Sequence, residues 1–405
     1  MRGIPGSGVI VFFLVIILIE VLAYLGILQL ISGKRQRKLG SIIYGFTTMS
    51  FLVIWMIAFF NPEKIRQTTD YTFFYFVIAL SVMNLFPKAL MALATIISFP
   101  FRMLRDQFLS KLILLSGVLI SLGIILSVAY GITFGKETLQ TNKVDLYLDS
   151  LPPQLNQLKI VQISDFHLGS FKSDQFLQTT TAEINRLKPD LIVFTGDMVN
   201  NYYQEMIGFE NALKEMKAPY GKFAIFGNHD YGDYSNWDEP EDKAINHAKV
   251  SQKIRDAGFK LLQNRNEKVE MNDTSLYIVG VENWGHKPFP QYAELDSAMQ
   301  NVPAPAFKIL LTHDPAHWEA EVLPKTNIAL TLSGHTHGGQ FGLKIAGITF
   351  SPMYLAQKFW AGLYLNNNQY LYVNQGWGCV GFPGRIDMNP EITLLTLHSN
   401  RIETN

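Results

Sequence analysis

The chain has 405 residues, enough for two or three domains, and its formal net charge is zero. A neutral balance gives no electrostatic reason to expect a nucleic acid or another polyanion as a partner. The single cysteine, Cys379, excludes a disulfide framework and a thiolate metal cluster. Hydrophobic residues make up 48% of the chain, and all the histidines lie after residue 160. The two ends of the chain are therefore predicted to lie in different solvents.

Four long apolar runs occupy the first third of the chain. Each is about long enough to cross a hydrocarbon core of ~30 Å as a helix. The runs cover residues 9–31, 41–60, 71–93 and 112–132. Because Pro87 and Lys88 interrupt the third run, we expect its helix to end near Phe86 and to continue as an interfacial segment. Residues 1–135 are predicted to form a transmembrane region of four helices.

The distribution of basic residues predicts the orientation of this region. Lys and Arg concentrate in the first loop (residues 34–38) and in the third loop (102–111), and the other loop and the N-terminus hold fewer. Cytoplasmic loops carry such an excess, so everything after residue 135 is expected outside the cytoplasm. Lys136 and Lys143, just after the last run, weaken this bias. The sequence predicts a multi-pass protein of the cell membrane.

Two ionisable residues, Glu20 and Lys88, lie within or beside the apolar runs. A charge inside a membrane is a candidate for a functional role. The structural alternatives are a polar contact between helices for Glu20 and a side chain that extends to the interface for Lys88. These structural roles are the favoured interpretation.

The rest of the chain reads as an α/β domain. Residues 136–157 are predicted to be a linker with a first strand at 144–148, and residues 158–405 to form the domain itself. Helices are expected at 173–187, where Ser173 would cap the first turn, at 205–216 and at 242–257. Strands are expected at 158–164, 191–195, 223–226, 260–263, 267–271, 275–281, 307–312, 328–332, 348–350, 369–374 and 392–398. Strands that alternate with helices and then close with further strands indicate a large layered sheet.

Polar residues that can bind metal follow five of these apolar strands. They are Asp165 and His167, then Asp197, then Asn228 with His229 and Asp230, then His313, and finally His335 with His337. In an extended segment, residues i and i+2 point the same way, so Asp165 with His167, and His335 with His337, are expected to face one pocket. Gly196, Gly227 and Gly334 directly precede such residues, where the backbone must turn tightly or approach another segment.

Aspartate, asparagine and histidine donors without cysteine suit first-row ions such as Mn, Fe, Zn and Co. One aspartate can bridge two ions in a hydrolytic centre. Taken singly, Asp165 could cap a turn, His313 could be a satisfied core histidine, and residues 227–230 could be an ordinary polar turn. The recurrence at five strand ends favours a metal site.

The segments D-F-H, G-D-M-V-N, G-N-H-D, T-H-D and G-H-T-H, in this order over residues 158–397, resemble the motifs of the calcineurin-like metallophosphoesterases. The resemblance implies an α/β fold, a four-layer α/β/β/α sandwich, with two metal ions at the sheet edge. By motif, Asp165, His167 and His337 would hold the first ion, and Asp197 would bridge to the second. The second ion would take the remaining three ligands, Asn228, His313 and His335. The family reaction is phosphoester hydrolysis by activated water, in which His229 would assist the leaving group.

Two positions of the sequence differ from two branches of the family, which narrows the expected class of enzyme. Asn200 stands where protein phosphatases have a carboxylate and purple acid phosphatases a tyrosine, and Phe226 stands where the former have an arginine. Both branches are therefore disfavoured. The segments at 338–340 and 376–392 are similar to the membrane-attached bacterial branch, for which phosphodiesters or lipid-linked phosphates are the expected substrates.

Several further residues are candidates for the site. His229 could be oriented by Asp230, a candidate catalytic residue, or by Asn200, which could also contact substrate. Arg385 could hold a phosphate group bidentately or form a structural ion pair. His286 could line the substrate cleft.

Trp360, Trp377 and Phe382 could form an aromatic wall at the membrane-proximal mouth of the site, or belong to the core. The predicted function is metal-dependent hydrolysis of a phosphoester, as a phosphodiesterase on a membrane or envelope substrate. One alternative is an enzyme for soluble nucleotides or nucleotide sugars; another is a non-catalytic, metal-binding membrane sensor. No nucleic-acid partner is expected.

Overall fold

The structure is a computed structural model that describes residues 6–66, 68–271, 273–286, 290–345 and 348–400. The chain divides into two compact units. The first unit comprises residues 1–65 and 72–131, and the second comprises residues 66–71 and 132–405. Each unit has its own apolar core, so each is described by itself.

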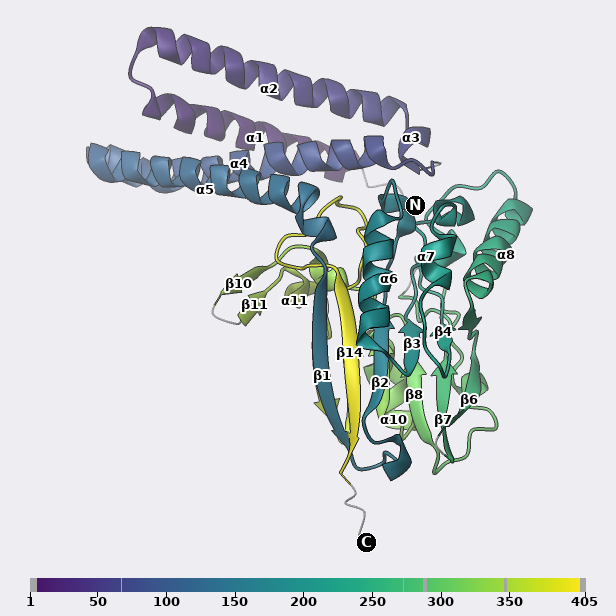
Figure 1. Cartoon of the computed structure of the whole chain (residues 1–405). Helices are drawn as coiled ribbons and strands as arrows, with labels where there is room; N and C mark the ends of the chain where they lie inside the picture. Colours follow the sequence, from purple (N-terminus) through teal and green to yellow (C-terminus); the bar gives the residue numbers. More distant parts are fainter. Residues whose placement is uncertain (1–5, 67, 272, 287–289, 346–347, 401–405) are drawn as a thin grey trace. The chain divides into compact units, whose positions relative to one another are not determined.

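The first unit is helical. Among the described residues, four helices are long and apolar enough to cross a membrane. They are α1 (Gly6–Leu30), α2 (Lys34–Phe60), α4 (Thr72–Met103) and α5 (Gln107–Thr133), with the short α3 (Glu63–Arg66) after α2 (Figure 1). Helix α2 begins earlier than expected and includes the basic cluster, because Lys, Arg and Gln are good helix formers.

The expected end of the third run near Phe86 is wrong. Helix α4 continues through Pro87 and Pro100 to Met103. Proline costs a helix one hydrogen bond, but neighbouring helices can compensate inside an apolar bundle. The hydroxyl group of Ser121 on α5 donates to the carbonyl oxygen of Pro87 at 3.1 Å. This bond ties α5 to α4 beside the proline, although the carbonyl group that loses its helical N–H partner is the one four residues before Pro87.

Glu20 and Lys88 form an ion pair inside this unit. The Nζ atom of Lys88 lies 2.8 Å from Oε1 of Glu20 and 2.9 Å from Oγ1 of Thr48. The hydroxyl group of Tyr44 donates to Oε2 of Glu20 at 2.8 Å. Glu20 therefore makes the polar contact between helices that was expected. The expectation that Lys88 extends to the interface is wrong, since its ammonium group is buried against Glu20.

The second unit contains two six-stranded sheets within the described residues. The first sheet has the order β1-β14-β2-β3-β4-β5. Its strands are β1 (Gln140–Leu148), β14 (Glu391–Ser399), β2 (Leu158–Ile163), β3 (Leu191–Phe194), β4 (Lys222–Ala224) and β5 (Phe259–Leu261). Strands β2 to β5 are parallel, so their carboxyl ends meet at one edge. Strand β1, expected as part of a linker segment, is paired along its whole length with β14.

The second sheet has the order β12-β13-β9-β8-β7-β6. Its strands are β12 (Gly362–Asn366), β13 (Gln369–Val373), β9 (Leu330–Ser333), β8 (Phe307–Leu311), β7 (Thr274–Gly280) and β6 (Arg265–Met271). Strands β7, β8, β9 and β13 are parallel. A separate hairpin pairs β10 (Leu343–Ile345) with β11 (Ile348–Phe350).

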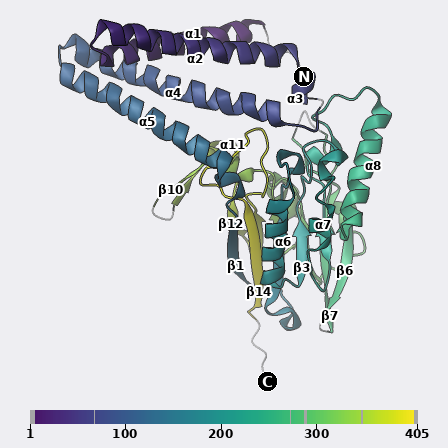
Figure 2. The same ribbon diagram turned by 45° about the horizontal axis from the view of Figure 1, so that its top comes forward.

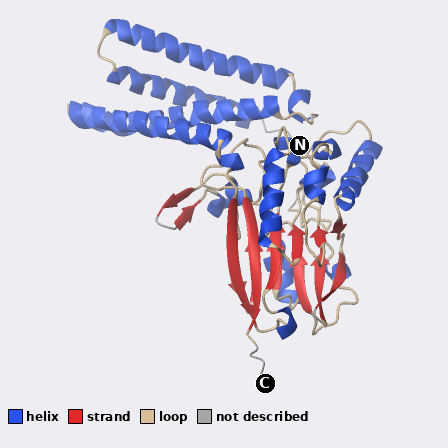
Figure 3. Ribbon diagram, viewed as in Figure 1, coloured by secondary structure: helices blue, strands red, loops and turns tan. Residues whose placement is uncertain are grey.

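The layers follow from alternation along the strands. Ile160 of β2 belongs to the apolar core between the two sheets, whereas Val161 belongs to the core beneath the helices. Because both faces of the strand are covered, the sequence of β2 reads as a continuous apolar run. A third core covers the outer face of the second sheet. These three cores separate helix, sheet, sheet and helix, and so confirm the predicted α/β sandwich; Figure 3 colours its helices and strands.

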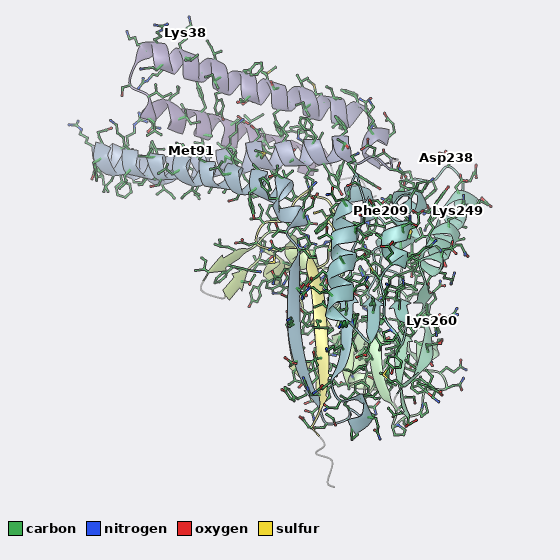
Figure 4. The ribbon with its side chains drawn as sticks, viewed as in Figure 1. Lys38, Met91, Phe209, Asp238, Lys249 and Lys260 are labelled. Carbon is green, nitrogen blue, oxygen red and sulfur yellow. The ribbon has the colours of Figure 1, made fainter. Side chains whose placement is uncertain are left out.

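The helical layers are made of short elements. Over the first sheet lie α6 (Gln175–Leu187), α7 (Glu210–Lys214) and α8 (Pro240–Asp256) (Figure 1). The remaining helices are α9 (Leu295–Ala298), α10 (Leu323–Lys325) and α11 (Met353–Ala356). Phe209 is buried beneath this layer, whereas Lys249 and Lys260 are exposed (Figure 4).

Two details of the helices differ from expectation. Helix α6 begins after Asp174, so Ser173 does not cap it. The helix expected at 205–216 is divided into the 3₁₀ turn η4 (Tyr203–Met206) and α7, because Gly208 between them adopts a φ of 94°, outside the right-handed helical region.

Candidate metal centre

The site lies at one edge of the sandwich, where strands β2, β3, β4, β8 and β9 end. The turns after these strands supply the predicted donors in chain order. The packing of the apolar strands fixes where each strand ends. The polar side chains of the residues that follow can then lie together at that edge of the sheets. The edge therefore gathers donors that are up to 172 positions apart, from Asp165 to His337.

The backbone at these donors is unusual. Asp165, His167, Asp197, His335 and His337 all have positive φ, between 42° and 73°. Left-handed conformations are uncommon outside glycine, although Asp and His adopt them more readily than most residues. The expectation of extended i, i+2 pairs is therefore wrong, because tight turns rather than strand alternation aim these side chains. Clustering of this strain at one edge is typical of a functional site.

Glycine is required where two of these turns meet. A Cβ atom at Gly196 would lie 2.5 Å from the backbone nitrogen of Gly227. At Gly227 it would lie 2.2 Å from Oδ1 of Asp197, and at Gly334 it would lie 2.4 Å from Oδ2 of Asp165. The predicted close approach at all three glycines is confirmed. Larger residues would push the donors apart.

A first group of donors comprises Asp165, His167, Asp197 and His337, whose ligand atoms all lie within 4.8 Å of one another. The Nε2 atoms of His167 and His337 are 3.0 Å apart. Oδ1 of Asp165 lies 3.3 Å from Nε2 of His337, and Oδ2 of Asp197 lies 3.4 Å from Nε2 of His167. All four side chains are buried, and their nitrogen and oxygen atoms face a common point.

A second group adjoins the first through Asp197. Nε2 of His313 lies 3.2 Å from Oδ2 of Asp197 and 3.1 Å from Oδ1 of Asn228. Nδ1 of His335 lies 2.9 Å from the same Asn228 oxygen. The carboxylate of Asp197 thus lies between the two groups of donors. The structure brings together all seven residues that the sequence predicted as ligands.

The electrostatics of the site favour a cation. Burial acts to raise the pKa of Asp197, but the charges of His313 and His229 and hydrogen bonds from His167 and His313 hold it well below its usual value. Burial lowers the pKa of His313, yet the charge of Asp197 and a hydrogen bond to it prevail and raise the pKa to about 10. Burial and the neighbouring His167 hold the pKa of His337 well below its usual value. Carboxylates bind metals in the charged form and imidazoles in the neutral form. Asp197 and His337 already have these forms, whereas His313 would have to give up its proton to a cation that takes its place. The types of donor, carboxylate, amide and imidazole, fit first-row ions.

His229 lies beside the donors and faces the same edge. Its backbone nitrogen donates to Oδ1 of Asp197 at 2.9 Å, and its Nδ1 donates to the carbonyl oxygen of Asn200 at 2.8 Å. Its ring is stacked on that of Tyr234, with centroids 4.4 Å apart. The carbonyl group of Asn200 therefore orients His229 and leaves Nε2 directed away from that bond.

Asp230 has a different role from the one predicted. Its Oδ2 accepts the backbone N–H groups of Asp197 and Gly227, each at 2.9 Å, and its Oδ1 accepts those of Met198 and Val199 at 2.8 and 3.2 Å. The fully buried carboxylate ties the turn after β3 to the turn after β4. Asp230 is thus a positioning residue for Asp197 and does not orient the ring of His229.

Arg385 is also placed differently from the prediction. Its side chain is fully buried, and Nε and Nη1 donate to the carbonyl groups of Gly378, Gln375 and Met388. Its Nη2 lies 3.1 Å from Nδ1 of His337. The guanidinium group is occupied by the protein itself and contacts His337, a predicted ligand, so the predicted phosphate contact is wrong.

Two further residues, Asn200 and His286, were predicted to contact the substrate; the first is buried and the second is exposed. The Asn200 side chain is buried and donates to Oε2 of Glu205 at 3.1 Å, so only its carbonyl group serves the site. His286 is exposed, and its Nε2 lies 2.9 Å from Oδ2 of Asp314, the residue after His313. His286 is therefore at the rim of the site, where contact with a substrate is open to it.

Two residues of the site were missed from the sequence. Glu205 accepts the backbone N–H groups of Asn200, Asn201 and Tyr202, and so holds the loop that orients His229. Tyr234 supports the ring of His229 by stacking. The sequence pattern that could have identified Glu205 is an acidic residue in a short turn, where its carboxylate can accept backbone N–H groups. No sequence pattern pointed to Tyr234.

Replacing the carboxylate of Asp230 with a neutral amide should loosen the backbone turns that position Asp197. Asp230→Asn would place amide hydrogens against N–H donors, and hydrogen bonds to a charged group contribute about 1.5–3 kcal/mol each. We expect a lower thermal unfolding midpoint and a lower metal content by elemental analysis. The control is Asp238→Asn, at an exposed position (Figure 4). Unchanged stability and metal content in Asp230→Asn would contradict the positioning role.

Comparison with known proteins gives a consistent result. Residues 158–339 match the family model of the calcineurin-like phosphoesterases. The chain is 31% identical over 305 residues to the uncharacterized metallophosphoesterase YkuE of Bacillus subtilis, covering 74% of this chain and 99% of that protein. It is 29% identical to an uncharacterized metallophosphoesterase of Aquifex aeolicus, covering 66% of this chain and 92% of that protein.

A vertebrate relative shares the same combination of parts. The chain is 28% identical over 278 residues to a transmembrane protein with a metallophosphoesterase domain from Danio rerio. This match covers 66% of the chain and 59% of the Danio rerio protein.

Proposed function

This chain belongs to the calcineurin-like phosphoesterase family and is a membrane protein with a phosphoesterase domain; on that premise we propose that it hydrolyses a phosphodiester with two metal ions. The observation that carries the proposal is the position of Asp197. Its Oδ2 lies 3.4 Å from His167 and 3.2 Å from His313, so that one carboxylate faces both groups of donors. A shared carboxylate is the feature that distinguishes a two-ion centre from a single site.

The proposed ligands follow the two groups. Asp165, His167 and His337 would hold one ion, and Asn228, His313 and His335 the other, with Asp197 between them. Such ions, drawn from Mn, Fe, Zn and Co, lower the pKa of water and neutralise charge on phosphoryl oxygens. The chain itself keeps the donors in place through Asp230, which binds the turn of Asp197, and Arg385, which contacts the ring of His337. Seven donors in place favour an enzyme over a non-catalytic sensor.

His229 is proposed to act on the leaving group. Burial lowers its pKa to about 4, so the free enzyme holds it neutral, with Nδ1–H donated to Asn200. An anionic phosphate beside Nε2 would raise this pKa, because an opposite charge favours the charged form. The ring could then donate a proton from Nε2 to the departing oxygen. Its fixed orientation by Asn200 and Tyr234 supports this role.

A membrane or envelope phosphodiester is the proposed substrate. The phosphoesterase domain follows four helices that are each long and apolar enough to cross a membrane, which keeps the domain beside the bilayer. We take all four as crossings, with the domain outside the cytoplasm because basic residues concentrate in the first and third loops. Soluble nucleotides remain the competing substrate class.

The side of the membrane can be tested by protease accessibility. In intact cells or spheroplasts, an added protease should cleave the phosphoesterase domain, since the proposed topology leaves it exposed. A cytoplasmic protein in the same cells serves as the control for lysis. Protection of the domain until the membrane is dissolved would reverse the orientation.

Replacement of the shared carboxylate should abolish activity. Asp197→Asn removes the charge that faces both groups of donors, so turnover of an aryl phosphodiester with added Mn²⁺ should disappear and the bound metal should fall. Asp256→Asn, at an exposed position of α8, is the matched control. Equal turnover of the parent and Asp197→Asn would refute the two-ion assignment.

Replacement of His229 should separate chemistry from metal binding. His229→Ala should retain both metals and lose turnover by about 10²–10⁴, the usual contribution of a general acid. His398→Ala is the control, because His398 pairs with Asp145 at the opposite end of β14 from the site. Loss of metal in His229→Ala would show that His229 is a ligand instead.

A further inference from the structure

The hairpin of β10 and β11 is an exposed apolar element. It lies outside both six-stranded sheets and projects beyond β1 in two views (Figures 1 and 2). Leu343 and Phe350 are cross-strand partners, and they are 53% and 56% exposed. In the following helix, α11, Tyr354 is 72% and Leu355 is 88% exposed. Contiguous apolar exposure of this kind marks a contact with a protein, a ligand or a lipid.

The hairpin and α11 enclose a groove of about 630 Å³. The apolar residues that line this groove, called the hairpin groove, are Phe341, Leu343, Phe350, Pro352, Tyr354 and Trp360. Phe382 packs behind Phe341, with ring centroids 4.5 Å apart, and Trp377 lies in the core against Phe176. Of the three aromatic residues considered from the sequence, Trp360 therefore lines the groove. Although Thr349, Ser351 and Tyr354 also bring hydroxyl groups to the groove, its mainly apolar lining suits a hydrocarbon chain better than a polar nucleotide.

The hairpin groove is joined directly to the metal centre. The hydroxyl group of Ser351 donates to the carbonyl oxygen of Gly338 at 2.7 Å, and that of Thr336 donates to the carbonyl oxygen of Trp360 at 2.6 Å. Thr336 and Gly338 flank His337, one of the seven donors. The segments that form the groove are thus fastened to both sides of a proposed ligand.

The hairpin is also joined to the start of the domain. Nζ of Lys344 lies 3.2 Å from Oε1 of Gln140, the first residue of β1. Gln140 is the partner of Glu391 at the start of β14, and β14 is antiparallel to β2, so β1 begins at the edge where the donors lie. Gln140 follows the last residue of α5, Thr133, by seven positions. A chain of this length reaches at most about 25 Å, which limits the distance between the end of α5 and the start of β1.

We propose that the hairpin groove holds an acyl chain of a lipid phosphodiester from the bilayer while the phosphate group of the same molecule lies at the metal centre. This proposal rests on the proposed function and specifies its substrate class. Three features select a lipid as the occupant: an apolar lining, attachment to both sides of His337, and a short tether to an apolar helix. Phe350 and Lys344 on the hairpin, with Tyr354 on α11, match the composition of surfaces that contact a membrane interface.

The test uses substrates that differ only in an alkyl chain. Methyl, butyl and octyl p-nitrophenyl phosphodiesters share one leaving group, so their relative kcat/KM values report contacts to the chain. With the full-length protein and Mn²⁺, we expect kcat/KM to be higher for the octyl than for the methyl ester by about tenfold or more, because each buried methylene group contributes to binding.

Charged residues in the hairpin groove should remove this preference. Leu343→Asp and Phe350→Asp should bring the octyl-to-methyl ratio to about one while turnover of the methyl ester stays within about twofold, since neither residue touches the donors. Both positions are exposed, so folding should tolerate the change. The control is Leu365→Asp, which is 57% exposed and lies on β12 outside the groove. It should keep the octyl preference.

The outcomes separate the groove from the chemistry. Hydrolysis of all three esters at equal rates, an unchanged ratio in Leu343→Asp and Phe350→Asp, or an equal loss in Leu365→Asp would overturn the groove and leave the phosphodiesterase proposal intact. Absence of hydrolysis of even the methyl ester would overturn the proposed function, and this inference with it. Hydrolysis of a soluble nucleotide diester in preference to the octyl ester would favour the competing substrate class.

Discussion

The site depends on the charge of one buried carboxylate. Asp197 is almost fully buried, yet its pKa is held well below its usual value by the imidazoles around it. A buried charge of this kind is costly unless opposite charge and hydrogen bonds surround it. The two groups of donors meet at Asp197, and both sheets contribute to them. The sandwich thus brings two sets of strand ends together around a group of residues that could bind metal.

Buried polar side chains form hydrogen bonds that stabilise the strained turns of the site. Asp230 accepts backbone N–H groups from two turns, Glu205 accepts three from the loop of Asn200, and Arg385 binds carbonyl groups beside His337. Left-handed turns at Asp and His persist only where the surroundings determine them. The hydrogen bonds of these three side chains fix the conformation of the site. This role explains why charged residues are buried around an apolar sandwich.

The chain that follows the apolar helices enters the second unit at the edge where the predicted ligands lie. Strand β1 begins at the edge where the donors lie, and the hairpin beside it carries exposed apolar side chains. A soluble enzyme gains nothing from such a surface, because it promotes association. Next to a bilayer, the same surface can receive hydrocarbon. The proposed lipid substrate therefore gives one physical reason for the four apolar helices and the hairpin.

The sequence by itself determined the four apolar helices, the α/β sandwich and the seven residues, predicted as metal ligands, that meet at the strand ends. Hydropathy and strand patterns are local, and each donor directly follows its own strand, so short segments carry the information. Only the tertiary structure decided which partners the remaining polar residues take. Lys88 pairs with Glu20, Asp230 binds backbone N–H groups, and Arg385 is buried against His337. These contacts join segments that are distant in the chain or depend on burial. The spacing of nearby residues in the sequence carries no information about either.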